Sequence, residues 1–322
     1  MKNIPVKQIA IGFWLVLILT ATGCATTPTA QSGDQSQGNI SVSGAFALYP
    51  MMTRWAEEYQ KLHPGVRFDI SAGGAGKGMA DTLAGAVDIG MVSRDITPEE
   101  QDSGAFWVAV TKDAVFPMVN AQNPVIQELL AKGVTQETFA GIFMSGEIQT
   151  WGQVTGQDRV SDPIHLYTRS DAAGAPETWA KYLGGKQEDL LGIGVFGDPG
   201  LADAVARDPL GIGYNNLNYA YDASSGQPVV GLIALPIDIN ANGQADPGEV
   251  LKTKSDALEA IASGRYPSPP ARLLNLVTLG QPSGMVQEFI LWVLGDGQQF
   301  VDQAGYIPLT ADQLAAEQAK LP

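Results

Sequence analysis

The spacing of apolar and polar positions predicts alternating strands and helices in the first part of the chain. Residues 48–63 read as a helix, because Met52, Trp55 and Tyr59 fall on one face at helical spacing. The predicted elements, in order, are a strand over 39–44, this helix, a strand over 66–71, a short helix that follows the glycine-rich residues 73–78 and ends near Gly85, and a strand over 87–92. Short connections between such elements indicate a parallel sheet with helices on both faces. Ligands bind such sheets at the carboxyl ends of the strands, where helix N-termini point.

The rest of the 322-residue chain continues the α/β pattern and is long enough to form a second domain. Strand patterns occupy residues 106–110, 116–119, 164–168, 211–214 and 273–278, and helical patterns occupy 135–143, 175–183 and 285–294. The strand over 116–119 is expected to cross into the second domain, and the strand over 164–168 leads into Arg169. Core positions are predicted at Trp55, Tyr59, Phe289 and Trp292.

The first 23 residues have the pattern of a secretory signal peptide rather than of folded structure. Residues 1–8 carry two lysines and no acid, and residues 9–20 are an apolar run too short to span a bilayer. Small residues follow up to Cys24, the only cysteine, and this arrangement resembles a bacterial lipobox. The resemblance implies cleavage before Cys24 and acylation there, palmitate included, with residues 24–38 as a flexible tether. The alternative is a plain signal peptide with an incidental cysteine.

Composition and charge restrict the function. Apolar residues make up 45% of the chain and aromatic residues 8%, which is typical of a globular protein. Removal of Lys2 and Lys7 with the signal leaves 17 of the 19 basic residues against 34 acidic ones, a net charge of −17. Such a surface repels nucleic acid and anionic lipid headgroups, so no nucleic-acid partner is expected. Any anion site has to be built locally, from backbone N–H groups and a few cations.

Eight separated segments, in order, resemble the PstS-type phosphate-binding proteins of ABC importers. They are residues 43–50, 73–78, 87–94, 169–174, 211–214, 263–267, 288–290 and 305–309. The resemblance implies a two-lobed periplasmic-binding-protein fold, each lobe a sheet flanked by helices, joined by a hinge and closing over one tetrahedral anion. Lobe I is expected over residues 39–113 and 270–322, and lobe II over 114–269. The protein is then an extracytoplasmic, lipid-anchored monomer that delivers phosphate or a similar oxyanion to an ABC permease in the membrane.

The same resemblance suggests which residues meet the anion. The expected ligand-binding residues are Ala45, Phe46, Ala75, Lys77, Ser93, Arg94, Arg169, Ala173 and Gly174. Loops at helix starts supply N–H groups, and an arginine adds a bidentate charge-assisted fork. The family usually has Ser or Thr hydroxyls in these loops, whereas this chain has alanines. Alternatives stay open: Arg169 in a surface ion pair, Arg94 in a salt bridge to Asp88 or Asp95, Lys77 merely solvated, and Phe46 in the core.

Two other classes of function compete with this interpretation. An enzyme is not expected, because the Gly-Lys pair at 76–77 lacks the other residues of a phosphate loop and the two histidines, His63 and His165, form no evident triad or zinc spacing. A surface adhesion or signalling module that retains the bilobed fold without transport is the main alternative, since the missing hydroxyls weaken the anion site.

Residues 238–249 match the twelve-residue calcium-loop pattern at every informative position. The expected ligands are Asp238, Asn240, Asn242, Gln244 through its carbonyl, Asp246 and Glu249. Gly243 stands at position 6, where the chain must turn sharply. Residues 229–237 before the loop read as a strand, so a paired-helix calcium sensor is not expected. The sequence predicts a structural Ca²⁺ that braces a loop, and the alternative is a polar surface turn.

Overall fold

A computed structural model describes residues 37–322. The predicted signal peptide, Cys24 and most of the tether lie outside these residues. Among the described residues, no helix combines the length and apolar character needed to cross a membrane.

The first lobe is built on the β-α-β-α-β unit expected from the sequence. Its elements are β1 (Gly38–Gly44), α1 (Tyr49–Leu62), β2 (Val66–Ala72), α2 (Ala75–Leu83), β3 (Ile89–Val92), α3 (Pro98–Asp102), β9 (Ala271–Leu279), α11 (Gly284–Leu294) and α12 (Ala311–Gln318). Strand β1 pairs in parallel with both β2 and β3, as predicted, and β3 pairs antiparallel with β9. The parallel strands therefore end together at one edge of the sheet.

The second lobe holds shorter strands and more helices. Its elements are α4 (Ile126–Lys132), α5 (Gln136–Ala140), α6 (Trp151–Thr155), β5 (His165–Arg169), α7 (Gly174–Tyr182), β6 (Ile193–Val195), α8 (Gly197–Arg207), β7 (Gly211–Asn216), α9 (Leu217–Ala220), β8 (Leu232–Ala234) and α10 (Lys254–Ala262). A π-helical turn over Gly141–Ser145 follows α5, where a single helix over 135–143 was predicted. Only Leu232–Ala234 of the strand predicted over 229–237 is formed.

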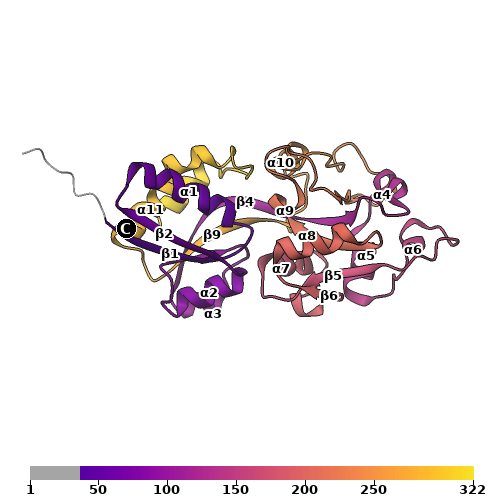
Figure 1. Cartoon of the computed structure of the whole chain (residues 1–322), viewed down its shortest axis with the longest axis horizontal. Coiled ribbons are helices and arrows are strands. Elements are labelled where there is room, and N and C mark those ends of the chain that lie inside the picture. The colour runs from indigo at the N-terminus through magenta and orange to yellow at the C-terminus, as the bar shows by residue number, and fades with distance from the viewer. Residues whose placement is uncertain (1–36) are drawn as a thin grey trace, which may run out of the picture. The chain divides into compact units, whose positions relative to one another are not determined.

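One strand, β4 (Ala105–Asn120), runs through both lobes (Figure 1). Its first part pairs with β9, and its second part pairs with β7 and β8. Two separate strands were predicted over 106–110 and 116–119, but Thr111, Lys112 and Asp113 continue the ladder to β9 with a register shift between Ala109 and Thr111. The lobes are thus joined by a two-stranded ribbon of β4 and β9, which is the structural hinge.

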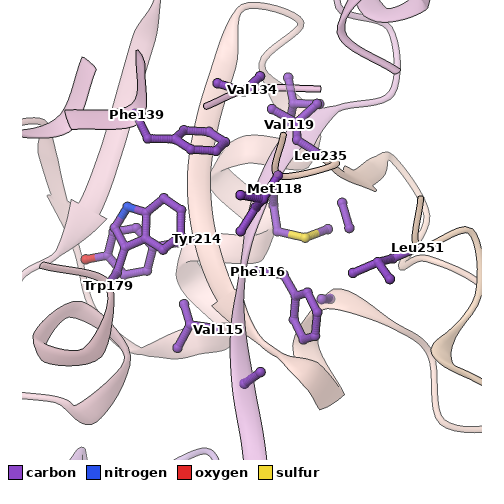
Figure 2. Packing of buried hydrophobic residues seen from close by; sticks show 14 of the residues in the cluster. Val115, Phe116, Met118, Val119, Val134, Phe139, Trp179, Tyr214, Leu235 and Leu251 are labelled. Atoms are coloured by element: carbon purple, nitrogen blue, oxygen red, sulfur yellow. The ribbon is translucent and has the colours of Figure 1, made fainter. Parts of the chain in front are cut away.

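Each lobe has its own hydrophobic core. The first core contains Trp55, Tyr59 and Phe289, as predicted, with Trp292 packed against it. Figure 2 shows the second core, where Phe116 and Met118 of β4 lie among side chains from surrounding elements, including Trp179 and Tyr214. Two cores with a shared hinge confirm the two-lobed α/β fold.

Candidate functional site

The turns that follow the three parallel strands of lobe I meet at one edge of its sheet. The N–H groups of Gly73 and Gly74 donate to the carbonyl of Gly44 at 2.9 and 3.0 Å, and the N–H of Ala45 donates to the carbonyl of Met91 at 2.9 Å. Gly44 has a φ of +133°, and a Cβ there would lie 2.3 Å from the Met91 oxygen. Glycine at this position is what lets the three turns pack together.

The corresponding turn of lobe II packs directly against this edge. The N–H of Gly76, in the first turn of α2, donates to the carbonyl of Ala172 at 3.1 Å. A Cβ built on Gly174, the first residue of α7, would lie 2.2 Å from both the carbonyl oxygen and Oγ of Ser93. The small residues at these positions therefore allow the N-termini of α2 and α7 to approach across the lobe boundary. The first N–H groups of these helices have no carbonyl partners within their own helices.

Eight of the nine predicted ligand residues lie at this lobe boundary. They are Ala45, Phe46, Ala75, Ser93, Arg94, Arg169, Ala173 and Gly174. Phe46 reaches across the boundary: its ring lies beneath the Arg169 guanidinium at 5.4 Å and makes an edge contact with Phe196 at 6.0 Å. The aromatic ring thus forms a wall of the boundary and is not confined to the core of lobe I.

The two predicted cations Lys77 and Arg94 form ion pairs with protein carboxylates. Lys77 binds Asp81 one turn along α2, and half of its side chain is exposed. Arg94 binds Glu100 at 2.5 Å and Glu177 of α7 at 3.0 Å, so its carboxylate partners are not Asp88 or Asp95. In these contacts, protein carboxylates neutralise the positive charges of both side chains. A role for either residue toward an anion stays a prediction.

Arg169 is fully buried and held by two carboxylates. Its Nε donates to Asp171 Oδ1 at 2.8 Å, and Nη1 donates to Asp198 Oδ2 at 2.7 Å. Its side chain is 0% exposed, so a surface ion pair is excluded. Burial disfavours its charge, but Asp198 and Asp171 hold the pKa of Arg169 above its ordinary value. The guanidinium therefore stays positively charged, and the carboxylates of lobe II hold it beside the boundary.

Asp198 is the residue that sequence reasoning missed. It lies in the first turn of α8, is 1% exposed and accepts from Asn216 Nδ2 as well as from Arg169. Burial raises its pKa, opposed mainly by Arg169 and Arg272. The sequence signal is an aspartate followed by Pro199 at the head of a helical pattern, where a carboxylate favours the helix N-terminus. Nothing in that pattern indicates its partner, 29 residues earlier in the chain.

The hinge ribbon carries a second buried ion pair beside the first. Asp113 of β4 and Arg272 of β9 are cross-strand partners, with 3.5 Å between Asp113 Oδ2 and Arg272 Nη2. Burial raises the pKa of Asp113 to about 6 against the pull of Arg272. Arg272 also donates from Nη1 to Thr178 Oγ1 of α7 at 2.9 Å and from Nη2 to Asn216 Oδ1. The hinge, α7 and β7 are therefore connected by one buried polar network.

Two cavities open along α7: the first is lined by residues of both lobes, and the second by residues of lobe II alone. One, of about 300 Å³, is lined by residues that include three cations, Arg94, Lys181 and Arg272. The other, of about 770 Å³, reaches Arg169 and Ala172. Glu177 and Lys181 line both cavities. The first cavity thus brings small solutes to the lobe boundary beside Arg94.

The arrangement combines the elements of an anion site: two facing helix N-termini, close backbone approach and a buried guanidinium. Asp171 and Asp198 also provide acceptors for a hydroxyl group. An acid-base or nucleophilic centre is not evident among the described residues, because His165 is bound to Asp208 at 2.7 Å in lobe II and His63 stacks on Tyr59 in lobe I.

Comparisons with known proteins agree with this arrangement. The family model described as PBP superfamily domain matches residues 29–296. The phosphate-binding protein PstS of Bacillus subtilis is 27% identical over 289 residues, covering 89% of this chain and 86% of that protein. The protein of the same name from Pseudomonas aeruginosa is 28% identical over 313 residues, covering 88% and 87% of the two chains.

Solved structures share the fold. A structure from Clostridium perfringens, described as a phosphate ABC transporter substrate-binding protein with bound phosphate, superposes with a TM-score of 0.69 at 23% identity and covers 85% of this chain and all of that one. An ABC-type phosphate transport receptor from Vibrio cholerae gives a TM-score of 0.61 at 19% identity, covering 84% of this chain and all of that one. At these identities the likeness shows the fold alone.

Proposed function

Since this chain belongs to the PBP superfamily, we propose that it is the extracytoplasmic receptor of an ABC importer and that its solute is phosphate. Relatives named phosphate-binding protein match nearly the whole chain in both directions, which supports the same class of solute here. The observation that carries the proposal is the close approach of the α2 and α7 N-termini, with Gly76 N–H bound to Ala172 O across the boundary. Arg169 lies in the same turn of lobe II.

The anion is proposed to bind mainly through backbone N–H groups. Residues 45–47, Ala75 and residues 173–175 carry no Ser or Thr hydroxyl, and Asp171 and Asp198 already bind the guanidinium of Arg169. An entering anion has to compete with these carboxylates for Arg169 and with Ala172 O for the Gly76 N–H. The N–H groups of Ala75 and Gly174, the first residues of α2 and α7, have no carbonyl partner within their own helices and are the proposed donors. Affinity therefore depends on how closely the two lobes can bring their helix N-termini together.

The two carboxylates also favour a protonated oxyanion. Hydrogen phosphate carries an O–H that can donate to a carboxylate, whereas sulfate has no proton to donate at neutral pH and meets only repulsion. The acceptors contributed by Asp171 and Asp198 therefore favour phosphate or arsenate over sulfate.

The delivery route is proposed from the N-terminal segment. The signal pattern and Cys24 support a mature protein acylated at that cysteine and tethered by residues 24–38 outside the cytoplasmic membrane, where it docks as a monomer on its permease. Two or more acyl chains are needed for stable anchoring, since a single chain binds membranes only marginally.

Titration calorimetry with phosphate, arsenate, sulfate, molybdate and tungstate tests the proposal. One phosphate per chain should bind, and the affinity for sulfate should be at least about tenfold lower. Gly174→Ala should lower the affinity for phosphate at least about tenfold. The new Cβ would lie 2.2 Å from Ser93 and would hold the lobes apart. The matched control is Gly194→Ala, whose Cβ meets nothing closer than 3.2 Å. Absence of binding by any of the five anions would favour an adhesion or signalling module instead.

A further inference from the structure

The loop over residues 238–249 lies in lobe II and takes no part in the anion site. It contains three carboxylates, three side-chain amides and two glycines in a twelve-residue order that suits an oxygen-ligated cation. Gly243 has a φ of +75°, and Ala241 at +54° is the only non-glycine residue with positive φ in the described part of the chain. The chain therefore makes the sharp turn that this ligand spacing requires.

The two carboxylates at the ends of the loop are buried and turned toward its interior. Asp238 is 3% exposed and Glu249 is 9% exposed. Asp238 accepts the N–H groups of Asn242 at 3.2 Å and Gly243 at 2.9 Å. Glu249 accepts the N–H groups of Ile239 at 2.8 Å and Asp246 at 3.0 Å. These bonds fix both ends of the loop around one small volume.

The loop concentrates negative charge without a cationic side chain to balance it. Within residues 37–322, Asp238, Asp246 and Glu249 form no salt bridge with Lys, Arg or His. The nearby Arg265 touches Gly248 but pairs with Glu259 at 2.9 Å. Burying carboxylates without a countercharge is costly, so this clustering calls for a cation from solution. The uncompensated negative charge therefore favours a bound cation independently of the spacing of the motif.

The side chains have to turn for the ion to bind. Asn240 and Asn242 donate their Nδ2 groups to Asp246 Oδ2 at 2.9 and 3.2 Å. As the side chains stand, no three His, Cys, Asp or Glu groups among the described residues gather into a metal cluster. Rotation of the two amides would present their oxygens, and Glu249 would then chelate with both oxygens. Neutral oxygens thus supply about half of the coordination sphere.

The loop is attached to the end of α4. The N–H of Ala245, at position 8, donates to Ala131 O at 2.9 Å, and the N–H of Asp238 donates to Val134 O at 3.1 Å. Val134 and Ile237 form a parallel bridge, and both belong to the core of lobe II. We propose that residues 238–249 bind one Ca²⁺ and that the ion locks this loop onto the C-terminal end of α4, bracing lobe II.

Calorimetric titration of chelator-treated full-length protein with CaCl₂ tests this proposal. One ion should bind with a Kd of about 0.1–1 mM, in the range of extracellular calcium modules. At about 10 mM CaCl₂ the melting temperature should rise by about 3–8 °C. Hydrogen exchange should slow over residues 126–134 and 237–249, with no change over 38–110. MgCl₂ at the same concentration should bind at least about tenfold more weakly.

Variants separate this site from general attraction of Ca²⁺ to an acidic surface. Glu249→Gln should lower the Ca²⁺ affinity at least about tenfold, whereas the exposed Asp158→Asn should bind as the wild type does. If Glu249→Gln does not fold, Asn242→Ala changes an exposed ligand and should also weaken binding. The proposal is overturned if wild type shows no heat and no melting shift, or if the loop variants bind Ca²⁺ as Asp158→Asn does. Phosphate titration of the same samples is an independent readout of the anion site.

Discussion

Replacement of Arg169 by methionine should destabilise the protein strongly, because it leaves two carboxylates without their countercharge. Asp171 and Asp198 both bind the guanidinium, and Asp198 is 1% exposed. Breaking a buried ion pair by removing one partner costs about 3–5 kcal/mol. Loss of the contact with the Phe46 ring adds about 0.5–2 kcal/mol. We therefore expect Arg169→Met to lower the free energy of unfolding by about 3.5–7 kcal/mol in total.

A second substitution tests the cause of this loss. In Arg169→Met together with Asp198→Asn, the most deeply buried uncompensated charge is removed, so part of the lost stability should return, about 1–3 kcal/mol. Asp198→Asn alone should destabilise the protein, since it weakens the bond to a charged donor. The comparison of all four proteins isolates the coupling between the two side chains.

The pH dependence gives an independent check of the same reasoning. Burial already raises the pKa of Asp198, and loss of Arg169 removes a group that lowers it. An acid whose folded pKa lies above its unfolded value gains protons on folding, so its penalty fades as pH falls. The deficit of Arg169→Met should therefore shrink between pH 7 and pH 5. Urea unfolding followed by tryptophan fluorescence measures it, and a loss below about 1 kcal/mol, or one unchanged by pH, would refute the argument.

Three further outcomes are expected. Asp113→Asn should remove a titrating group from the hinge. Since the pKa of Asp113 is raised to about 6, the wild type should gain stability relative to the variant as pH falls from 7 to 4, by on the order of 2–3 kcal/mol. Parallel pH profiles of the two proteins in urea unfolding would contradict this. Gly44→Ala should cost at least about 2 kcal/mol in the same assay, because the new Cβ would meet Met91 O at 2.3 Å, and a neutral change would disprove the close packing of the turns. Cys24→Ser should release the protein from the membrane fraction of the producing cell, whereas continued anchoring in fractionation would exclude acylation at Cys24.

Much of the fold was predictable because local patterns decide it. The β-α-β-α-β unit follows from apolar spacing in residues 39–92, and parallel strands of one unit must end at the same edge, which brings the turns at Ala45, Ala75 and Ser93 together. The resemblance to PstS-type proteins added Arg169 and Gly174 from the other lobe. These segments therefore converge because of the sheet topology, and short sequence motifs are enough to indicate that topology.

The partners of the charged residues could not be predicted in the same way. Arg94 binds Glu177, which lies 83 positions away on the other lobe, and Arg169 at the end of β5 binds Asp198 in the first turn of α8. The first pair depends on how the lobes pack and the second on how two elements of lobe II pack, and the sequence gives no periodic signal for either. The continuity of β4 was missed for a related reason, since polar Thr111, Lys112 and Asp113 are paired with β9 and the C-terminal segment rather than with neighbours in sequence.

We propose that a small oxyanion is held between the N-termini of α2 and α7. Crystals grown with arsenate test it directly, because the anomalous signal of arsenic locates the anion without ambiguity. We predict one strong arsenic peak at the lobe boundary, within hydrogen-bond distance of backbone N–H groups of Ala75 and Gly174. A fully closed boundary with no arsenic there, in crystals where arsenate occupies only exposed lysines or arginines, would contradict the account.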